Sequence, residues 1–393
     1  MSKFELTPYP YDELNSIKQI ALSKFGEVID LSIGTPIDDT PNFVIDALCN
    51  SKDANGYPPS IGTVTLRSAI KDWYKRRLDV DIDIDLIAAV VGTKEFVASL
   101  PTYLRLMNPE KDVVLGPSLA YPTYEFGAKL AGLKYVGIPP RHNEDRSMDL
   151  ESINEEYLKR ALLMWVNSPS NPDGHVESLR EFYEFANQNS ILTVSDECYM
   201  EYVYGVEAES ILQHGIENVL ALHSLSKRSN AAGLRVGFYA GDRSYVLFLE
   251  EIRKHAGLMV PGPVQSAGVA ALSDDSHVEV QRERYFERLK VLADAFSSIG
   301  IDVNLPKGGF YLFIKAPDIK YESVLEAAKL KVKSSLSWKF TAFLALTTGV
   351  LVSPGEFYGS DGTGYVRIAV VQTDEKISLA SKRISQLEGR QFT

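Results

Sequence analysis

The chain has 393 residues, of which 45% are hydrophobic and 24% charged, and its net charge is -11. This length predicts two or three structural units rather than one small core. This negative net charge argues against a surface that binds nucleic acid or an anionic membrane, because the chain has no excess of basic residues to neutralise phosphates.

Other features of the composition favour a soluble cytoplasmic protein. The two cysteines, Cys49 and Cys198, are far apart in sequence and form neither a disulfide framework nor a zinc motif, so no metal is expected. The stretch from Met1 to Ile20 has no apolar segment typical of a secretory signal. The longest apolar stretches are too short or too interrupted to span a bilayer.

The first predicted strand, Val28–Gly34, leads into a turn-rich stretch. Gly34 allows a ligand to approach the backbone closely, although a plain turn between a strand and a helix is an equal alternative. Thr40 is predicted to cap a helix that starts with Pro41, since proline is tolerated in a first turn.

A loop rich in glycine and proline, Gly56–Gly62, exposes one aromatic residue, Tyr57. Such punctuation is usually just a loop. An amphipathic helix follows it, with one apolar side made of Leu66, Ile70, Trp73 and Tyr74.

The segment Ile87–Val91 has the pattern of a buried strand, and Gly92, Thr93 and Lys94 then open a helix over Phe96–Leu106. The free N–H groups and the positive end of a helix attract an anion, so this junction is a candidate phosphate site. No Walker lysine pattern and no GxGxxG motif is present, which favours a single phosphate over a nucleotide.

From Val113 onward, apolar strands alternate with helical segments, which predicts a mostly parallel sheet covered by helices. The predicted strands are Val113–Leu115, Tyr135–Ile138, Leu162–Val166, Leu192–Val194, Val219–Leu222 and Val236–Ala240. Ligands of such sheets bind beyond the carboxyl ends of the strands. A charged helix, Gln281–Lys290, is expected to connect to a second domain.

Three chemically informative residues follow these strands. Tyr121 is suited to stack on a planar heterocycle, with a core tyrosine as the equal alternative. Asn171 lies in a turn that follows a buried strand, a position that favours a functional role, with turn chemistry alone as the alternative. Asp196 places a carboxylate at the end of a buried strand, which is costly unless a cation such as a protonated pyridine meets it, and a helix N-cap is the alternative.

Two basic residues also follow or interrupt apolar runs. Lys227 comes after Val219–Leu222, where a dry site would make its amine a nucleophile and base, unless it is an ordinary surface lysine. Arg367 interrupts the apolar strand that begins at Tyr365, where a carboxylate would accept its bidentate fork, with a structural salt bridge as the alternative.

The segment Ser224-x-Ser226-Lys227, followed by Gly233-x-Arg235-x-Gly237, resembles the Schiff-base segment of the fold-type-I pyridoxal-phosphate aminotransferases of class I/II. The stretch Asn167–Gly174 resembles their Asn-Pro-x-Asn-Pro-x-Gly turn, and the resemblance covers nearly the whole chain. It implies an α/β three-layer sandwich with a mostly parallel mixed central sheet, plus a smaller α+β domain. It also implies a homodimer with active sites shared between subunits.

The implied domains are an N-terminal arm with the first part of the small domain (1–45), a large cofactor-binding domain (46–281) and a C-terminal small domain (282–393). Lys227 would hold pyridoxal 5'-phosphate and act as the base, and Asp196 would keep the pyridine nitrogen protonated. Tyr199 would form a hydrogen bond to the phenolic oxygen of the cofactor, beside Asn171. The remaining implied cofactor-binding residues are Gly92, Thr93, Lys94, Tyr121, Asn171, Ser224, Arg235 and Tyr57, the last from the partner subunit. The implied substrate-binding residues are Arg367, Gly34 and Asn171.

Within this family, four segments resemble the N-succinyldiaminopimelate aminotransferases of bacterial lysine synthesis. They are Tyr57–Gly62, Gly92–Pro101, Ala120–Gly127 and His223–Asn230. The resemblance implies glutamate as donor and 2-oxoglutarate as product. Ser168 and Asp173 depart from the proline and threonine that are common in the family. An aspartate, aromatic or LL-diaminopimelate aminotransferase and a pyridoxal-phosphate C–S lyase are the alternatives.

Two other classes of protein fit less well. A serine hydrolase needs a nucleophile elbow, and Gly116–Ala120 is a near miss without an evident triad histidine. A non-catalytic binding domain fused to a regulator would need a DNA-binding segment, and no N-terminal extension is expected.

Overall fold

The computed structural model describes residues 10–141 and 146–387, so the start of the predicted N-terminal arm lies outside the described residues. The chain divides into two compact units. The large unit is Thr35–Phe286 with Pro306–Gly309, and the small unit is Met1–Gly34, Glu287–Leu305 and Phe310–Thr393. The predicted domain boundaries after residues 45 and 281 stay predictions. In the part of the chain that is described, no helix has the length and apolar character needed to cross a membrane.

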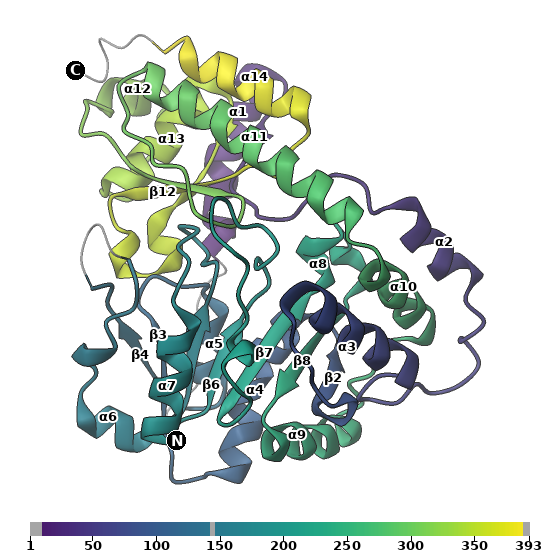
Figure 1. The fold of residues 1–393 in the computed structure, drawn as a ribbon. Coiled ribbons are helices and arrows are strands. Elements are labelled where there is room, and N and C mark those ends of the chain that lie inside the picture. Colours follow the sequence, from purple (N-terminus) through teal and green to yellow (C-terminus); the bar gives the residue numbers. More distant parts are fainter. Residues whose placement is uncertain (1–9, 142–145, 388–393) are drawn as a thin grey trace. The chain divides into compact units, whose positions relative to one another are not determined.

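The large unit contains a seven-stranded sheet in the order β2-β8-β7-β6-β5-β3-β4 (Figure 1). Only β8 runs antiparallel to its neighbours, which confirms the predicted mixed, mostly parallel sheet. The strands are β2 (Ile87–Val90), β3 (Val113–Pro117), β4 (Lys134–Ile138), β5 (Ala161–Asn167), β6 (Thr193–Asp196), β7 (Val219–Ser224) and β8 (Gly237–Gly241).

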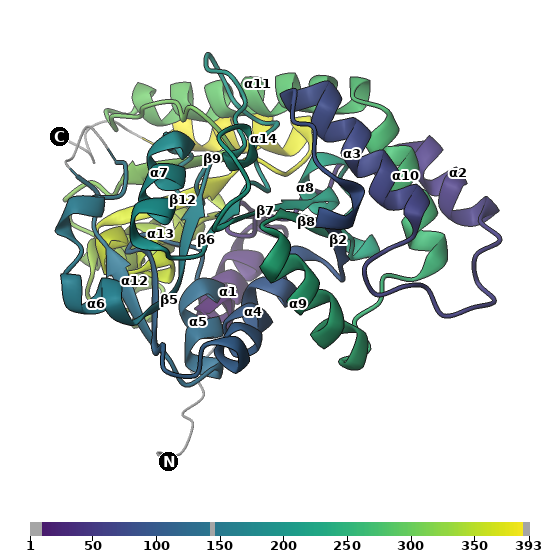
Figure 2. The same ribbon diagram turned by 60° about the horizontal axis from the view of Figure 1, so that its bottom comes forward.

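Helices cover both faces of this sheet, because alternate residues of each buried strand point to opposite sides. Leu163 and Trp165 of β5 join one apolar cluster, whereas Met164 and Val166 join the other. Figure 2 shows α4, α5 and α9 on one side of the sheet and α3 and α7 on the other. The helices of this unit are α2 (Asn42–Asn50), α3 (Val64–Leu78), α4 (Thr93–Met107), α5 (Thr123–Leu130), α6 (Glu155–Arg160), α7 (Leu179–Asn189), α8 (Leu225–Arg228), α9 (Arg243–His255) and α10 (Gly262–Ser273).

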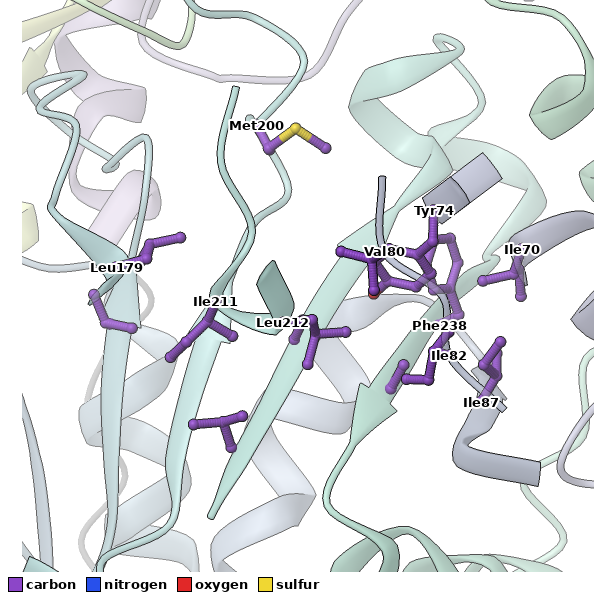
Figure 3. Close-up of a cluster of buried hydrophobic side chains, with 14 of the residues drawn as sticks. Ile70, Tyr74, Val80, Ile82, Ile87, Leu179, Met200, Ile211, Leu212 and Phe238 are labelled. Carbon is purple, nitrogen blue, oxygen red and sulfur yellow. The ribbon is translucent and has the colours of Figure 1, made fainter. Parts of the chain in front are cut away.

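The predicted amphipathic helix is α3, and its apolar side is buried as expected. Ile70 and Tyr74 pack with Ile87 of β2 and Phe238 of β8, and Leu179 of α7 belongs to the same cluster (Figure 3). Because the helix buries its whole apolar stripe, the hydrophobic pattern alone determines which face it presents.

The small unit contains a three-stranded antiparallel sheet, β11-β12-β9, and a parallel pair, β1-β10. Its elements are α1 (Asn15–Phe25), β1 (Ile29–Asp30), β9 (Tyr311–Lys315), α12 (Glu322–Ala327), α13 (Leu336–Thr348), β10 (Val350–Leu351), β11 (Ser353–Pro354), β12 (Tyr365–Ala369) and α14 (Asp374–Ser385). The helix α11 (Ser276–Ser298) contains the predicted charged helix and contributes residues to both units.

Several local predictions differ from the structure, among them the strand predicted over Val28–Gly34, which is a strand only at Ile29–Asp30. The helix α2 begins at Asn42 with Pro41 as its N-cap residue, and the hydroxyl of Thr40 donates to the carbonyl oxygen of Asn230 at 2.7 Å instead of capping the helix. Strands β6 and β7 extend two residues beyond their predicted ends, so Asp196 and Ser224 are the last residues of strands. The prediction ended both strands at the last apolar residue, but Asp196 and Ser224 still pair with residues of neighbouring strands.

Candidate active site

Parallel strands bring several predicted site residues to one edge of the large sheet. Asn167 of β5 lies opposite Asp196 of β6, and Asp196 lies opposite Leu222 of β7. Since the carboxyl ends of parallel strands meet at the same edge, the segments after them begin side by side. Asn171 therefore follows β5 and Lys227 follows β7, the strands on either side of β6, at this edge.

Lys227 lies on α8, a single helical turn directly after β7. The hydroxyl of Ser224 caps this turn by accepting a hydrogen bond from the N–H of Ser226 at 3.1 Å. Lys227 is half-buried, whereas both of its neighbours in the chain, Ser226 and Arg228, are buried. The local structure thus holds the lysine backbone in the protein and leaves its side chain partly accessible.

Asp196 is a buried carboxylate, with 7% of its surface exposed. Its Oδ2 accepts a hydrogen bond from the hydroxyl of Tyr124 at 2.8 Å, and its Oδ1 accepts one from the N–H of Cys198 at 3.2 Å. Burial raises the pKa of Asp196 above its usual value, and these hydrogen bonds oppose that shift. A cation placed beside the carboxylate would favour the ionised form, so the site is suited to a protonated pyridine nitrogen.

The side chain of Asn167 connects two predicted site residues. Its Nδ2 donates to the carbonyl oxygen of Asp196 at 2.8 Å, and its Oδ1 accepts the N–H of Asn171 at 2.8 Å. Asn171 and Tyr199 are both buried. The turn that carries Asn171 is therefore fixed to the end of β6, three residues before Tyr199.

The predicted phosphate residues gather at the N-terminus of α4. Gly92 is its N-cap, with φ +75°, and a Cβ atom there would lie 2.0 Å from Nη2 of Arg235. Gly237 pairs with Ser224 across β7 and β8, and a Cβ on Gly237 would lie 3.0 Å from Cγ2 of Thr93. A glycine N-cap leaves the first-turn N–H groups open to an anion, and the guanidinium of Arg235 adds positive charge. This arrangement fits a phosphate group.

Three other predicted cofactor residues have more accessible side chains. Lys94 is exposed, and Tyr57 is 97% exposed. Tyr121 is half-buried and meets Tyr124 edge to face, with ring centroids 5.7 Å apart. The placement of Tyr121 beside the ring that bonds Asp196 is compatible with stacking on a heterocycle.

Arg367 and Gly34 belong to the small unit. Arg367 is 2% exposed, and its guanidinium carbon lies 4.3 Å from the ring centroid of Tyr311 and 4.7 Å from that of Tyr358. Its Nη2 donates to the carbonyl oxygen of Ser32 at 2.6 Å. A Cβ on Gly34 would lie 2.2 Å from the hydroxyl oxygen of Tyr311, so glycine is required for this packing. The aromatic rings hold the arginine fork in one orientation.

Tyr124 is a residue that the sequence patterns did not single out. It stacks on Trp165 with ring centroids 4.9 Å apart, and its hydroxyl bonds the carboxylate of Asp196. A second tyrosine three positions after Tyr121, in the first turn of α5, was the available signal. Among the described residues, no group of three or more His, Cys, Asp and Glu is placed to hold a metal ion.

The comparisons with known proteins identify the family of this chain. The family model described as aminotransferase class I and II matches residues 26–384. The chain is 40% identical to the 4-dedimethylamino-4-oxo-anhydrotetracycline transaminase OxyQ of Streptomyces rimosus, over 97% of this chain and 99% of that protein. It is 34% identical to the LL-diaminopimelate aminotransferase of Aquifex aeolicus, over 98% of this chain and 97% of that protein. The substrate-bound structure of BacF from Bacillus subtilis matches with a TM-score of 0.85 and 28% identity, and covers 98% of both chains.

The chain belongs to the class I and II aminotransferases. This family uses pyridoxal 5'-phosphate, so the predicted cofactor and the predicted fold type are both confirmed. The residues described above fit that cofactor, because a buried carboxylate and an anion-binding helix terminus lie at the same edge of one sheet.

Proposed function

We propose that Lys227 binds pyridoxal phosphate covalently and moves protons in an amino-group exchange between glutamate or 2-oxoglutarate and a second amino or keto acid. The observation that carries the proposal is that the large unit has one negatively charged site and one positively charged site at the same edge of its sheet. Asp196 offers a buried negative charge, and the Gly92–Arg235 cluster offers a positive site for phosphate. A cofactor with a basic ring nitrogen and a phosphate group matches both.

When bound, the cofactor withdraws electrons from the substrate through its protonated ring. The task of Asp196 is to keep the ring nitrogen protonated, and the hydroxyl of Tyr124 and the N–H of Cys198 hold the carboxylate in place. Asn171 and Tyr199 are proposed to donate hydrogen bonds to the phenolic oxygen. Both are buried, so water competes little for these hydrogen bonds.

The Nζ of Lys227 is proposed to take the proton from the substrate's α-carbon. A lysine amine acts as a base near neutral pH when its surroundings disfavour its charged form. The burial of the residues on each side of Lys227 restricts water at the backbone of this turn. The same residue is proposed as both anchor and base.

The small unit is proposed to supply the substrate clamp. The guanidinium of Arg367 is buried between two tyrosine rings, which favours a planar carboxylate as its ligand. Gly34 is proposed to leave space for the substrate beside this arginine. We further propose a homodimer in which Tyr57 reaches the phosphate of the other subunit, since 97% of its surface is exposed and is therefore accessible to a second chain.

The second substrate is a separate part of the proposal. The local motifs resemble the N-succinyldiaminopimelate enzymes, but the named relatives at 34% and 40% identity act on LL-diaminopimelate and on a tetracycline intermediate. The relatives therefore favour the alternative, an LL-diaminopimelate type of amino acid, over the succinylated compound. We propose LL-diaminopimelate as the first substrate to test, with N-succinyl-LL-2,6-diaminopimelate as the second.

The test is an absorption spectrum of the protein with added pyridoxal phosphate, followed by glutamate. We expect a long-wavelength band that is lost in Lys227→Ala and bleached by glutamate in the unaltered protein. Lys254→Ala is the matched control, because Lys254 is an exposed lysine on α9 that pairs with Glu251. A band that persists in Lys227→Ala, or is absent from the unaltered protein, would refute the proposal.

Product analysis separates the substrates and the reactions. The protein is incubated with 2-oxoglutarate and each diaminopimelate compound in turn, and glutamate formation is measured. A higher kcat/KM with LL-diaminopimelate supports that substrate, and a higher value with the succinylated compound supports the other. Release of ammonia and a thiol from a sulfur-containing amino acid, without glutamate formation, would identify a C–S lyase instead.

A further inference from the structure

The backbone of Lys227 is held by a second set of residues on the turn that follows β6. The hydroxyl of Tyr202 lies 2.8 Å from the carbonyl oxygen of Lys227 and 3.2 Å from that of Arg228, and it donates to them. Glu201, the residue before it, forms an ion pair with Arg228, with 2.5 Å between Oε2 and Nε. The turn thus contacts α8 through two consecutive residues.

We propose that Tyr202, Glu201 and Arg228 are positioning residues that hold Lys227 in register with Tyr199. This inference rests on the proposed role of Lys227 as the covalent anchor and base. None of the three positioning residues needs to contact the cofactor. They act on the backbone that carries Lys227 and Tyr199.

Arg228 has the contacts of a residue fixed in one position. It is 5% exposed. Its Nη1 donates to the carbonyl oxygen of Ala271 at 2.6 Å, and its Nη2 donates to that of Asp274 at 3.1 Å and to Oδ1 of Asp275 at 2.5 Å. Together with Glu201, these partners occupy all sides of the guanidinium fork, which a lysine ammonium cannot reproduce.

The buried charges around this arginine are matched by nearby opposite charges. Glu201 is 5% exposed and also lies 3.0 Å from Nε of Arg77. Asp275 also pairs with Arg76, at 2.6 Å, and its pKa is lowered below its usual value, because the opposing effect of burial is outweighed by the hydrogen bond from Arg76 and the charge of Arg228. Burying such a network is costly, and a buried ion pair by itself is weak evidence for stability. A network of this kind beside Lys227 is better explained by the geometry that it imposes.

The same short turn connects this network to Tyr199. The N–H of Tyr202 donates to the carbonyl oxygen of Tyr199 at 2.8 Å, and the ring of Tyr202 packs edge to face on Tyr285, with centroids 5.2 Å apart. A displacement of Tyr202 would therefore move both Tyr199 and the backbone of Lys227. Tyr202 therefore links the backbone of Tyr199 to the backbone of Lys227.

The helix α8 needs such support because it has only four residues. One helical turn is not stable by itself, since nucleation costs more than one turn of hydrogen bonds returns. Leu225 and Arg228 are buried, and the polar contacts from Tyr202 and Glu201 add to this burial in fixing the turn.

The experiment uses the full chain loaded with pyridoxal phosphate, in the variants Arg228→Lys and Tyr202→Phe. Sodium borohydride fixes cofactor that is covalently attached, and peptide mass spectrometry measures the fraction of Lys227 that carries it. Arg288→Lys is the matched control: Arg288 is 3% exposed, and its Nε lies 2.6 Å from Oδ1 of Asp374 in the small unit. The pH midpoint of the long-wavelength band and the thermal midpoint are recorded for each protein.

We expect the fraction attached at Lys227 to fall by roughly threefold or more in both variants at saturating cofactor, because a small misplacement of a reacting group has a large effect on its reaction. The pH midpoint of the band is expected to shift in the same variants, while Arg288→Lys changes only the thermal midpoint. Tyr202→Phe removes a single oxygen atom, so it decides the question if Arg228→Lys does not fold.

Two results would overturn the inference, and they are distinguishable. If both variants lose thermal stability as Arg288→Lys does, while attachment and the pH midpoint stay unchanged, the network has a structural role only. If the unaltered protein shows no attachment at Lys227, the proposed function is wrong and the inference falls with it.

Discussion

Gly92→Ala tests the phosphate site most directly, because glycine is required there for two separate reasons. Its φ of +75° and ψ of 147° lie near a backbone region that is essentially restricted to glycine, so an alanine there costs on the order of 1–3 kcal/mol. A Cβ atom would also lie 2.0 Å from Nη2 of Arg235. That atom is the end of a flexible side chain, so the collision is relieved by moving the guanidinium rather than the backbone.

Gly257→Ala separates these two effects. Gly257 has a φ of +70°, and a Cβ atom there would have no atom within 4 Å. Both variants should therefore lose unfolding free energy through backbone strain, on the order of 1–3 kcal/mol each. Only Gly92→Ala should also displace Arg235. The expected loss is one hydrogen bond to a charged phosphate, about 1.5 kcal/mol because Arg235 is exposed, or about a tenfold higher Kd for the cofactor.

Two measurements check this prediction. Chemical denaturation gives the free energy of unfolding of each cofactor-free protein, and titration of the cofactor-free protein with pyridoxal phosphate gives the Kd. Equal Kd values for Gly92→Ala and Gly257→Ala would refute the reasoning, because the phosphate would then not depend on the Gly92–Arg235 cluster.

Three further predictions concern Asp196 and the small unit. Burial raises the pKa of Asp196, so the cofactor-free protein becomes less stable as the pH rises through the folded-state pKa and the carboxyl ionises. Asp196→Asn should remove that loss, so the denaturation midpoint of the variant at pH 7 should not fall below that of the unaltered protein. Tyr124→Phe removes a hydrogen bond to the carboxylate, so the acidic limit of cofactor binding should move to higher pH in Kd measurements, and an unchanged limit would contradict the contact. Gly34→Ala should push Tyr311 against Arg367 and raise KM for amino acids more than it lowers kcat, and a change in kcat alone would argue against the proposed clamp.

Local patterns in the sequence were sufficient for most of the architecture. The apolar runs and their punctuation predict the strands of the large sheet, because a buried parallel strand needs consecutive apolar residues. The side of α3 that is buried follows from its helical periodicity. Lys227, Asp196 and Gly92 were identified because each stands near the end of an apolar run in the chain, a relation that depends only on nearby residues.

Contacts between distant parts of the chain required the tertiary structure. Tyr124 and Asp196 are 72 residues apart, and nothing in the pattern around either one indicates the other. Gly92 meets Arg235 because β8 lies between β2 and β7, and the alternation of strands and helices does not determine that order.

The partners of Arg228 were hidden for the same reason. Arg228 forms ion pairs with Glu201 and Asp275, which the fold brings to α8 from two other segments of the chain. The sequence by itself determined which residues have the chemistry of an aminotransferase site, since that chemistry is a property of each side chain and its immediate neighbours. Only the tertiary structure decided which groups hold those residues in place, because electrostatic and packing interactions depend on distance in space and not on distance along the chain.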